Sequence, residues 1–161
     1  NSIMKAINRN GTIQVYNSTP SQFTGQRKSY ITGFNLLSES QQRAEGLFDV
    51  VVPDYNSNTQ QLGSIYWDSE NTTFSYPVED KEWTETLTEI KEKKISNLNS
   101  NLNIALSATD WVYIRQLDRG TAIPQEIQEE RNALRVSAMA KETEINNLDS
   151  KSEVADYDIT L

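Results

Sequence analysis

The hydrophobic pattern changes character about halfway along the chain. Up to Pro77, short apolar runs rich in β-branched and aromatic residues alternate with turn-forming clusters, which is typical of short strands. From Glu79 onward, apolar residues recur every three to five positions and turn signals are rare, which is typical of amphipathic helices. The sequence therefore predicts a small β-rich domain over residues 1–78, a helical segment over 79–149 and a C-terminal tail over 150–161.

Two β-hairpins are expected in the first half. Met4–Ile7 and Thr12–Tyr16 flank a turn that contains an Asn-Gly pair, and such a pair readily adopts the positive φ of a tight hairpin. Leu62–Trp67 and Thr72–Tyr76 flank a second polar turn. The sheet built from these hairpins should be mostly antiparallel.

A short helix and a buried strand are expected between the hairpins. Ser38 and Gln41 have the spacing of a capping box, and Gly46 stands where a helix would need a left-handed end. Phe48–Val52 is a continuous apolar run stopped by Pro53, which is typical of a central strand covered on both faces.

Two long amphipathic helices are expected in the second half. After Trp83, the first carries one apolar stripe, made of Leu87, Ile90, Ile95, Leu98, Leu102 and Ala105. Pro124 fits the first position of the second helix, whose stripe is Ile127, Leu134, Ala138, Ile145 and Leu148. Such stripes stabilise little in isolation, so the helices should pack on each other, on the sheet or on another chain.

A short helix should connect the two long ones. Ser107 and Asp110 have capping spacing, while Trp111, Ile114 and Leu117 share one face, and Gly120 can end the helix. The helical half is thus predicted to be a helical hairpin with a short connecting helix.

The last residues show a different pattern. Tyr157, Ile159 and Leu161 alternate with Asp158 and Thr160, as in a half-buried strand. Such a tail strand could close an edge of the chain's own sheet or add to the sheet edge of a partner. The predicted class is α+β: an N-terminal sheet, a helical hairpin and a tail strand.

Charge argues against nucleic acid as a partner. The chain of 161 residues has a net charge of −8, and the helical half holds 10 basic and 17 acidic side chains. Binding to a phosphate backbone is favoured by clustered cations, which this chain lacks. No apolar run approaches a membrane span and no signal peptide is evident, so we expect a protein of the virion or the cytoplasm, without a membrane partner.

The absence of Cys and His removes most common catalytic chemistry. Thiol nucleophiles, thiolate metal sites and the usual general base at neutral pH are all excluded. We therefore expect no enzymatic activity, no catalytic or metal site and no cofactor.

Three clusters nevertheless allow a chemical hypothesis. Tyr66, Trp67, Phe74 and Tyr76 could form an aromatic platform for a sugar, although a sheet core is the interpretation that we favour for these rings. Asp68, Glu70 and Asn71 could offer oxygen ligands to calcium, but the full spacing of a calcium loop is missing. Glu126, Glu129 and Glu130 could be a carboxylate set, yet the positive end of a helix dipole already explains them.

One segment of the helical half resembles a family. Leu106-Ser107-Ala108-Thr109-Asp110-Trp111, followed by Pro124 and by Arg131-Asn132-Ala133-Leu134-Arg135, is similar to the helical module of bacteriophage tail assembly chaperone-like and tail-fibre-associated proteins. In that family a Leu-x-x-Thr-Asp-Trp segment leads through a Pro-containing turn into a helix bearing Tyr-Arg-x-Ala-Leu-Arg. Glu130 stands here where the family has Tyr. The runs Phe48–Pro53 and Leu62–Trp67 also look like the β module that precedes it.

The resemblance implies virion morphogenesis and carries no catalytic residue across. It implies a structural virion component of the tail or fibre, or a transient assembly chaperone, with other phage structural proteins as partners. A glycan-binding receptor module is the alternative. The long apolar stripes also favour a homo-oligomer. The residues that we predict to bind partners are Trp83, Leu98, Leu102, Trp111, Leu134, Tyr157, Ile159 and Leu161.

Overall fold

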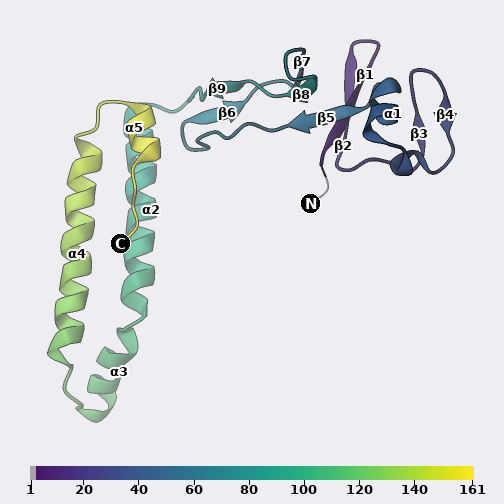
Figure 1. Cartoon of the computed structure of the whole chain (residues 1–161). Coiled ribbons are helices and arrows are strands. Elements are labelled where there is room, and N and C mark those ends of the chain that lie inside the picture. Colours follow the sequence, from purple (N-terminus) through teal and green to yellow (C-terminus); the bar gives the residue numbers. More distant parts are fainter. Residues whose placement is uncertain (1–2) are drawn as a thin grey trace. The chain divides into compact units, whose positions relative to one another are not determined.

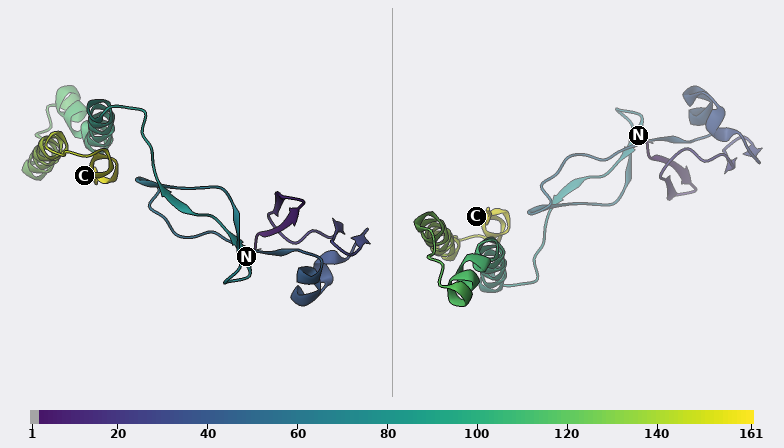
Figure 2. Two further views of the ribbon diagram at one scale, coloured as in Figure 1. Left: turned by 90° about the horizontal axis from the view of Figure 1, so that it is seen from above. Right: turned by 90° about the horizontal axis from the view of Figure 1, so that it is seen from below.

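The chain folds into two compact units. The computed structural model describes residues 3–161, and the division between the units falls after Lys81. Strands make up most of the first unit and helices most of the second, so the predicted α+β class is confirmed (Figures 1 and 2). The division lies three residues beyond the predicted one because strand β9 (Val78–Asp80) pairs with β6 (Gln60–Leu62) in the first unit.

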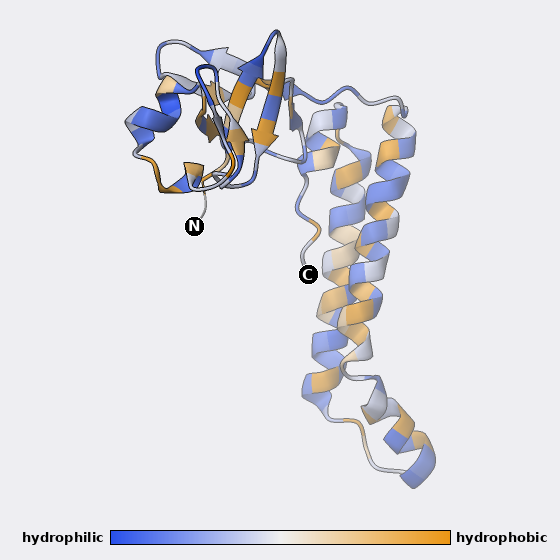
Figure 3. Ribbon diagram, turned by 90° about the vertical axis from the view of Figure 1, so that its right-hand side faces the viewer, coloured by the Kyte–Doolittle hydropathy of each residue, from blue (hydrophilic) through white to orange (hydrophobic). Residues whose placement is uncertain are grey.

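A five-stranded sheet forms the centre of the first unit. Its order is β2-β1-β5-β8-β7, and every pairing is antiparallel except that of β5 with β8. The run predicted as a central strand does occupy the middle of this sheet. The prediction that both faces of this strand are covered is wrong, since Val50 is buried while Val51 and Val52 are exposed. Apolar residues, orange in Figure 3, recur along these strands. The strands are β1 (Lys5–Arg9), β2 (Thr12–Tyr16), β5 (Phe48–Val51), β7 (Tyr66–Asp68) and β8 (Thr73–Ser75).

The first predicted hairpin is confirmed and the second only in part. Asn10 and Gly11 have φ of 54° and 92°, the positive values that a tight turn between β1 and β2 requires. Strands β7 and β8 form the second hairpin. The strand predicted over 62–67 is broken, however, because Leu62 ends β6 in a separate two-stranded sheet and Gly63 weakens the strand at that point.

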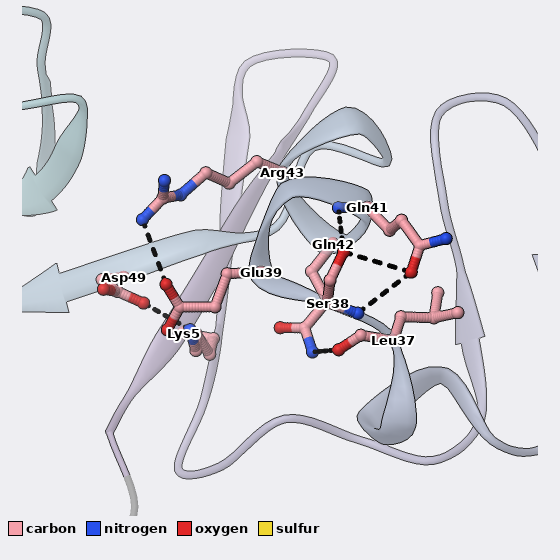
Figure 4. A network of polar contacts seen from close by, with 8 residues as sticks. All are labelled: Lys5, Leu37, Ser38, Glu39, Gln41, Gln42, Arg43 and Asp49. Atoms are coloured by element: carbon pink, nitrogen blue, oxygen red, sulfur yellow. Dashed lines mark hydrogen bonds and ion pairs between the residues drawn. The ribbon is translucent and has the colours of Figure 1, made fainter.

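The remaining elements of the first unit surround a small aromatic core. Phe34 is fully buried and stacks on Phe23 with ring centroids 4.2 Å apart. Helix α1 begins with the predicted capping box, in which Ser38 Oγ accepts from the Gln41 backbone and Gln41 Oε1 accepts from the Ser38 backbone (Figure 4). These elements are β3 (Phe23–Thr24), β4 (Ser29–Tyr30), the 3₁₀ helix η1 (Phe34–Leu36) and α1 (Glu39–Ala44).

A buried carboxylate fastens the loop between β3 and β4 to the end of α1. Glu45 accepts hydrogen bonds from the backbone N–H groups of Arg27 at 2.9 Å and Lys28 at 3.2 Å, and from Arg27 Nε at 3.3 Å. The backbone N–H of Arg27 contributes most to holding the pKa of Glu45 below its ordinary value of 4.5, and it outweighs the opposing effect of desolvation. The loop therefore depends on Glu45 being ionised.

Acidification should remove the contribution of Glu45. A lowered folded-state pKa means that the carboxylate stabilises the fold above the unfolded pKa and loses this effect as the pH falls through the folded pKa. We expect the difference in unfolding free energy between the wild type and Glu45→Gln to be constant above about pH 4.5 and to shrink below it. Urea denaturation across that pH range measures the difference. If the difference in unfolding free energy between the two proteins grew on acidification, the stabilising role of ionised Glu45 would be contradicted.

The second unit is a helical hairpin in which the apolar stripes of the two long helices pack on each other. Its core holds Ile90 and Leu98 from α2, Ala138 and Ile145 from α4, and Val154 from α5. Apolar residues, orange in Figure 3, recur along the long helices of this unit. The helices are α2 (Leu87–Ser107), α3 (Asp110–Arg119), α4 (Gln125–Asn146) and α5 (Lys151–Asp156).

The helix ends differ in detail from the expected ones. Thr86 and Glu89 form a capping box at the start of α2, so Trp83 precedes the helix. Ser107 does not cap α3, because its Oγ donates to the Ile104 carbonyl of the preceding turn. Pro124 is the N-cap residue of α4 rather than its first helical residue. Gly120 ends α3 in a left-handed conformation, as expected.

The predicted tail strand is wrong. Residues 151–156 form helix α5, and the segment after it pairs with no strand among the described residues. This segment runs back along α2 (Figures 1 and 2), where Asn101 Nδ2 donates to the Ile159 carbonyl at 3.2 Å. Tyr157, Ile159 and Leu161 pack against the helical core. An alternating extended segment can fill a groove between helices as well as a sheet edge, and the sequence pattern does not distinguish the two.

Within residues 3–161, no helix combines the length and the apolar character that crossing a membrane requires.

Candidate protein-contact surface

Arg131 of α4 anchors the connecting helix α3. Its Nη1 group donates to the Leu106 carbonyl at 2.6 Å, to Thr109 Oγ1 at 2.9 Å and to Asp110 Oδ1 at 2.8 Å. Its guanidinium carbon also lies 4.8 Å from the centre of the Tyr113 ring. The side chain of Arg131 is almost fully buried, while that of Asp110 is 54% exposed. We call this set of contacts the Arg131 anchor.

The anchor links two segments that lie far apart in the sequence, residues 106–111 and residues 131–135. Leu106, Thr109 and Asp110 come from the first of these segments, and Arg131 opens the second. One nitrogen of the Arg131 guanidinium, Nη1, contacts a carbonyl, a hydroxyl and a carboxylate, and these charge-assisted contacts fix the end of α2 and the start of α3 relative to α4. These residues therefore have a structural role: they set the position of α3 between α2 and α4.

The fixed helix presents an apolar face to solvent. Trp111 is 57% exposed, Ile114 is 64% exposed and Leu117 is 88% exposed, although they follow one another at helical spacing. On the opposite side, Val112 is buried. We call Trp111, Ile114 and Leu117 the α3 face.

The indole of the α3 face is held by its own helix. The guanidinium carbon of Arg115 lies 4.9 Å from the centre of the Trp111 ring, one helical turn away. A ring restrained in this way loses little further conformational freedom when a partner covers it. Rigid, exposed aromatic and aliphatic side chains of this kind are typical anchors of protein interfaces.

Most residues that we predicted to bind partners are occupied within the chain. Leu98 is 0% exposed and belongs to the helical core, so its assignment to a partner surface is wrong. Leu134 is half-buried in α4. Of the eight, Trp111 alone is well exposed. The others pack against the core of the second unit and serve its own stability: Trp83, Leu102, Tyr157, Ile159 and Leu161.

Tyr157 shows how the tail is held. Its hydroxyl donates to the Glu144 carboxylate, and the Lys141 ammonium lies 5.6 Å from the centre of its ring. Desolvation, and then the hydrogen bond to Glu144, raises the pKa of Tyr157 to about 12. The tail side chain is thus engaged by α4 and is not displayed for pairing with another sheet.

The two carboxylate clusters lie in a hairpin turn and near the exposed start of a helix. Asp68 accepts hydrogen bonds from the Glu70 and Asn71 backbones and from the Asn71 side chain at 2.7 Å, and this last bond contributes most to lowering its pKa. These contacts close the hairpin turn, which agrees with the structural interpretation rather than with a calcium site. Glu126, Glu129 and Glu130 are all exposed. No group of three or more acidic side chains in the described part of the chain could hold a metal ion.

The predicted aromatic platform is divided between two faces of the hairpin. Tyr66 and Trp67 are consecutive in β7, so their side chains point to opposite faces. Trp67 packs on Phe74 with ring centroids 5.0 Å apart, and on Phe48, which the sequence did not assign to this cluster. Tyr76 packs against the core that contains Phe74.

Comparisons of the chain with protein-family models, with curated proteins and with solved structures gave no significant match.

Removal of the Arg131 side chain should detach α3. Arg131→Met keeps the apolar stem but removes the charged donor from Thr109 Oγ1 and from the Leu106 carbonyl, which then accepts only from Thr109. Hydrogen bonds to charged groups contribute about 1.5–3 kcal/mol each. We expect the unfolding free energy of the helical unit to fall by about 2–3 kcal/mol. Urea denaturation followed by helical circular dichroism measures this. Arg135→Met, at an exposed position of the same helix, should change it by less than about 0.5 kcal/mol.

Proposed function

We propose that this chain is a tail- or fibre-associated bacteriophage protein that acts through protein contacts made by the α3 face. The observation that supports this proposal is the exposure of three apolar side chains on a helix that a buried arginine holds in place. Surface apolar residues gathered on one face commonly mark an interaction site. The resemblance of the flanking motif to phage tail modules indicates other phage structural proteins as partners.

A non-enzymatic role fits the chemistry of the chain. It contains neither Cys nor His, and the carboxylates near the start of α4 lie in solvent, where nothing prepares them for acid–base work. A protein with this composition that keeps a fixed apolar face is better suited to binding than to catalysis. We propose no cofactor and no metal.

The long apolar stripes of α2 and α4 are not free to bind a second copy. These stripes, which suggested a homo-oligomer, cover each other and the tail. The α3 face is an exposed apolar surface on which a second copy could pack. We propose a phage structural protein as its main partner, and sedimentation equilibrium of the purified chain tests the second copy directly.

Mass spectrometry of mature particles tests the proposal. In particles of the virus whose genome encodes the chain, stoichiometric presence would make it a virion component. Absence from particles, together with a cross-linked complex with a tail or fibre protein in infected lysate, would make it a transient assembly chaperone. Absence from both would contradict the proposal.

A pair of substitutions tests the α3 face itself. Ile114→Gln with Leu117→Gln should reduce recovery of the chain in particles, or in the cross-linked complex, about tenfold or more, because each interface anchor contributes at least about 1 kcal/mol. The thermal stability should change little, since both positions are exposed. Leu36→Gln in the first unit, where Leu36 is 83% exposed, is the matched control and should leave recovery unchanged.

A further inference from the structure

A small cavity in the first unit is lined by rings and amides. It has a volume of about 250 Å³, and its walls come from β1, the loop between β3 and β4, the segment after α1, β5, β7 and β8. None of the lining side chains is charged. The lining residues are Asn8, Gln26, Gly46, Phe48, Trp67 and Phe74.

Its aromatic wall is rigid. Trp67 meets Phe48 at 4.7 Å and Phe74 at 5.0 Å between ring centroids, each with an interplanar angle of 65°. Phe74 is buried, whereas Trp67 keeps 40% of its surface exposed. The two phenyl rings therefore hold the indole in one orientation while part of it stays open to a ligand.

Two amide side chains supply the polar part of the lining. Asn8 Oδ1 accepts from the Gly11 backbone N–H at 2.8 Å, which orients the amide and leaves its Nδ2 group as a donor. The Gln26 side chain makes no hydrogen bond within residues 3–161. The Gln26 amide can thus donate and accept, and the Asn8 amide can donate, without breaking a contact that the fold requires.

Gly46 makes room for the Gln26 amide. A Cβ atom at position 46 would lie 2.7 Å from the Gln26 side-chain carbon Cδ, and the φ of Gly46 is +90°, a value that favours glycine. The backbone N–H of Gln26 donates to the Glu45 carbonyl at 3.0 Å, which fixes the start of the side chain. The amide therefore rests against the backbone beside the cavity.

We propose that this cavity binds the ring of a neutral monosaccharide. The apolar face of a pyranose ring packs on an indole, and its hydroxyl groups pair with side-chain amides. The volume lies below the roughly 300–1,000 Å³ of pockets for drug-sized ligands, so one ring fits better than two. An uncharged lining favours a neutral sugar over a uronic acid or an amino sugar with a protonated amine. This proposal does not depend on the α3 face.

Titration with simple glycosides tests the proposal. The probes are methyl glucopyranoside, methyl galactopyranoside, methyl mannopyranoside and N-acetylglucosamine, with glucuronate as a charged comparator and adenosine as an aromatic one. The readout is the amide and indole NMR spectrum of the full chain. We expect saturable shifts of the Trp67 indole and the Gln26 side chain with at least one neutral sugar, and smaller shifts with glucuronate.

Variants at the rim separate binding from folding. Gln26→Ala keeps the backbone hydrogen bond to Glu45 and should weaken the sugar Kd about two- to tenfold, the value of one or two lost hydrogen bonds. Gln22→Ala, at an exposed position outside the cavity, is the matched control and should leave the Kd unchanged. Trp67→Phe keeps a ring in the aromatic cluster and should also weaken binding.

The proposal is overturned if none of the neutral sugars shifts the Trp67 and Gln26 signals, or if adenosine alone does so. It is also overturned if Gln26→Ala and Gln22→Ala bind the sugar equally well. The mass spectrometry of particles tests the protein-contact proposal independently. A failure of the sugar proposal is therefore distinct from a failure of the protein-contact proposal.

Discussion

Replacement of Asp49 by Ala should destabilise the first unit by about 3 kcal/mol, because it leaves the Lys5 ammonium buried without a counter-charge. Lys5 and Asp49 lie directly opposite each other in the register of β1 and β5, and they form an ion pair (Figure 4). Only 7% of Lys5 is exposed. Urea denaturation followed by the fluorescence of Trp67 measures the loss, once Trp83 and Trp111 are replaced by Phe in every variant compared.

Two further variants show whether burial causes this effect. In Lys5→Met with Asp49→Leu, both charges are replaced by apolar groups, and most of the stability should return. Glu39→Ala removes the partner of Arg43 in an exposed pair with an N–O distance of 3.5 Å, and it should cost less than about 1 kcal/mol. If Asp49→Ala were as mild as Glu39→Ala, the pair would not be buried in solution.

Leu98→Ala should destabilise the helical unit by about 3 kcal/mol. Leu98 lies on α2 and is fully buried in the core of the helical unit. A Leu-to-Ala change at such a position loses the free energy of burying the removed methyl groups and leaves a cavity. Helical circular dichroism during urea denaturation measures the change. Ile104→Ala is the matched control, because Ile104 lies on the same helix and is 71% exposed, and it should cost less than about 1 kcal/mol.

Both outcomes of the Leu98 experiment are informative. A large loss would show that Leu98 is as buried in solution as it is in this structure. A small loss, similar to that of Ile104→Ala, would contradict the place of Leu98 in the core of the helical unit.

Local sequence signals predicted the elements that depend on short-range physics. The Asn10-Gly11 turn, the Ser38 capping box and the end of α3 at Gly120 each follow from the backbone preferences of a few neighbouring residues. The apolar residues of α2 recur with the helical period of about 3.6 residues, so the sequence predicted that they lie on one face of the helix and that this face is covered.

What covers each apolar face was decided only in three dimensions. The alternation of Tyr157, Ile159 and Leu161 satisfies a strand as well as a groove beside α2, and tertiary packing selected the groove. The sequence likewise predicted that Leu98 is covered, but it did not indicate whether residues of the same chain or of a partner cover it.

The candidate site shows the same division between sequence and structure. The sequence by itself determined that Trp111, Ile114 and Leu117 share one face of a helix, since this follows from their spacing. Only the tertiary structure decided that this face is exposed, because the Arg131 anchor joins residues more than twenty positions apart and turns Val112 inward. Contacts over such a separation depend on how the chain returns on itself, which local preferences do not specify.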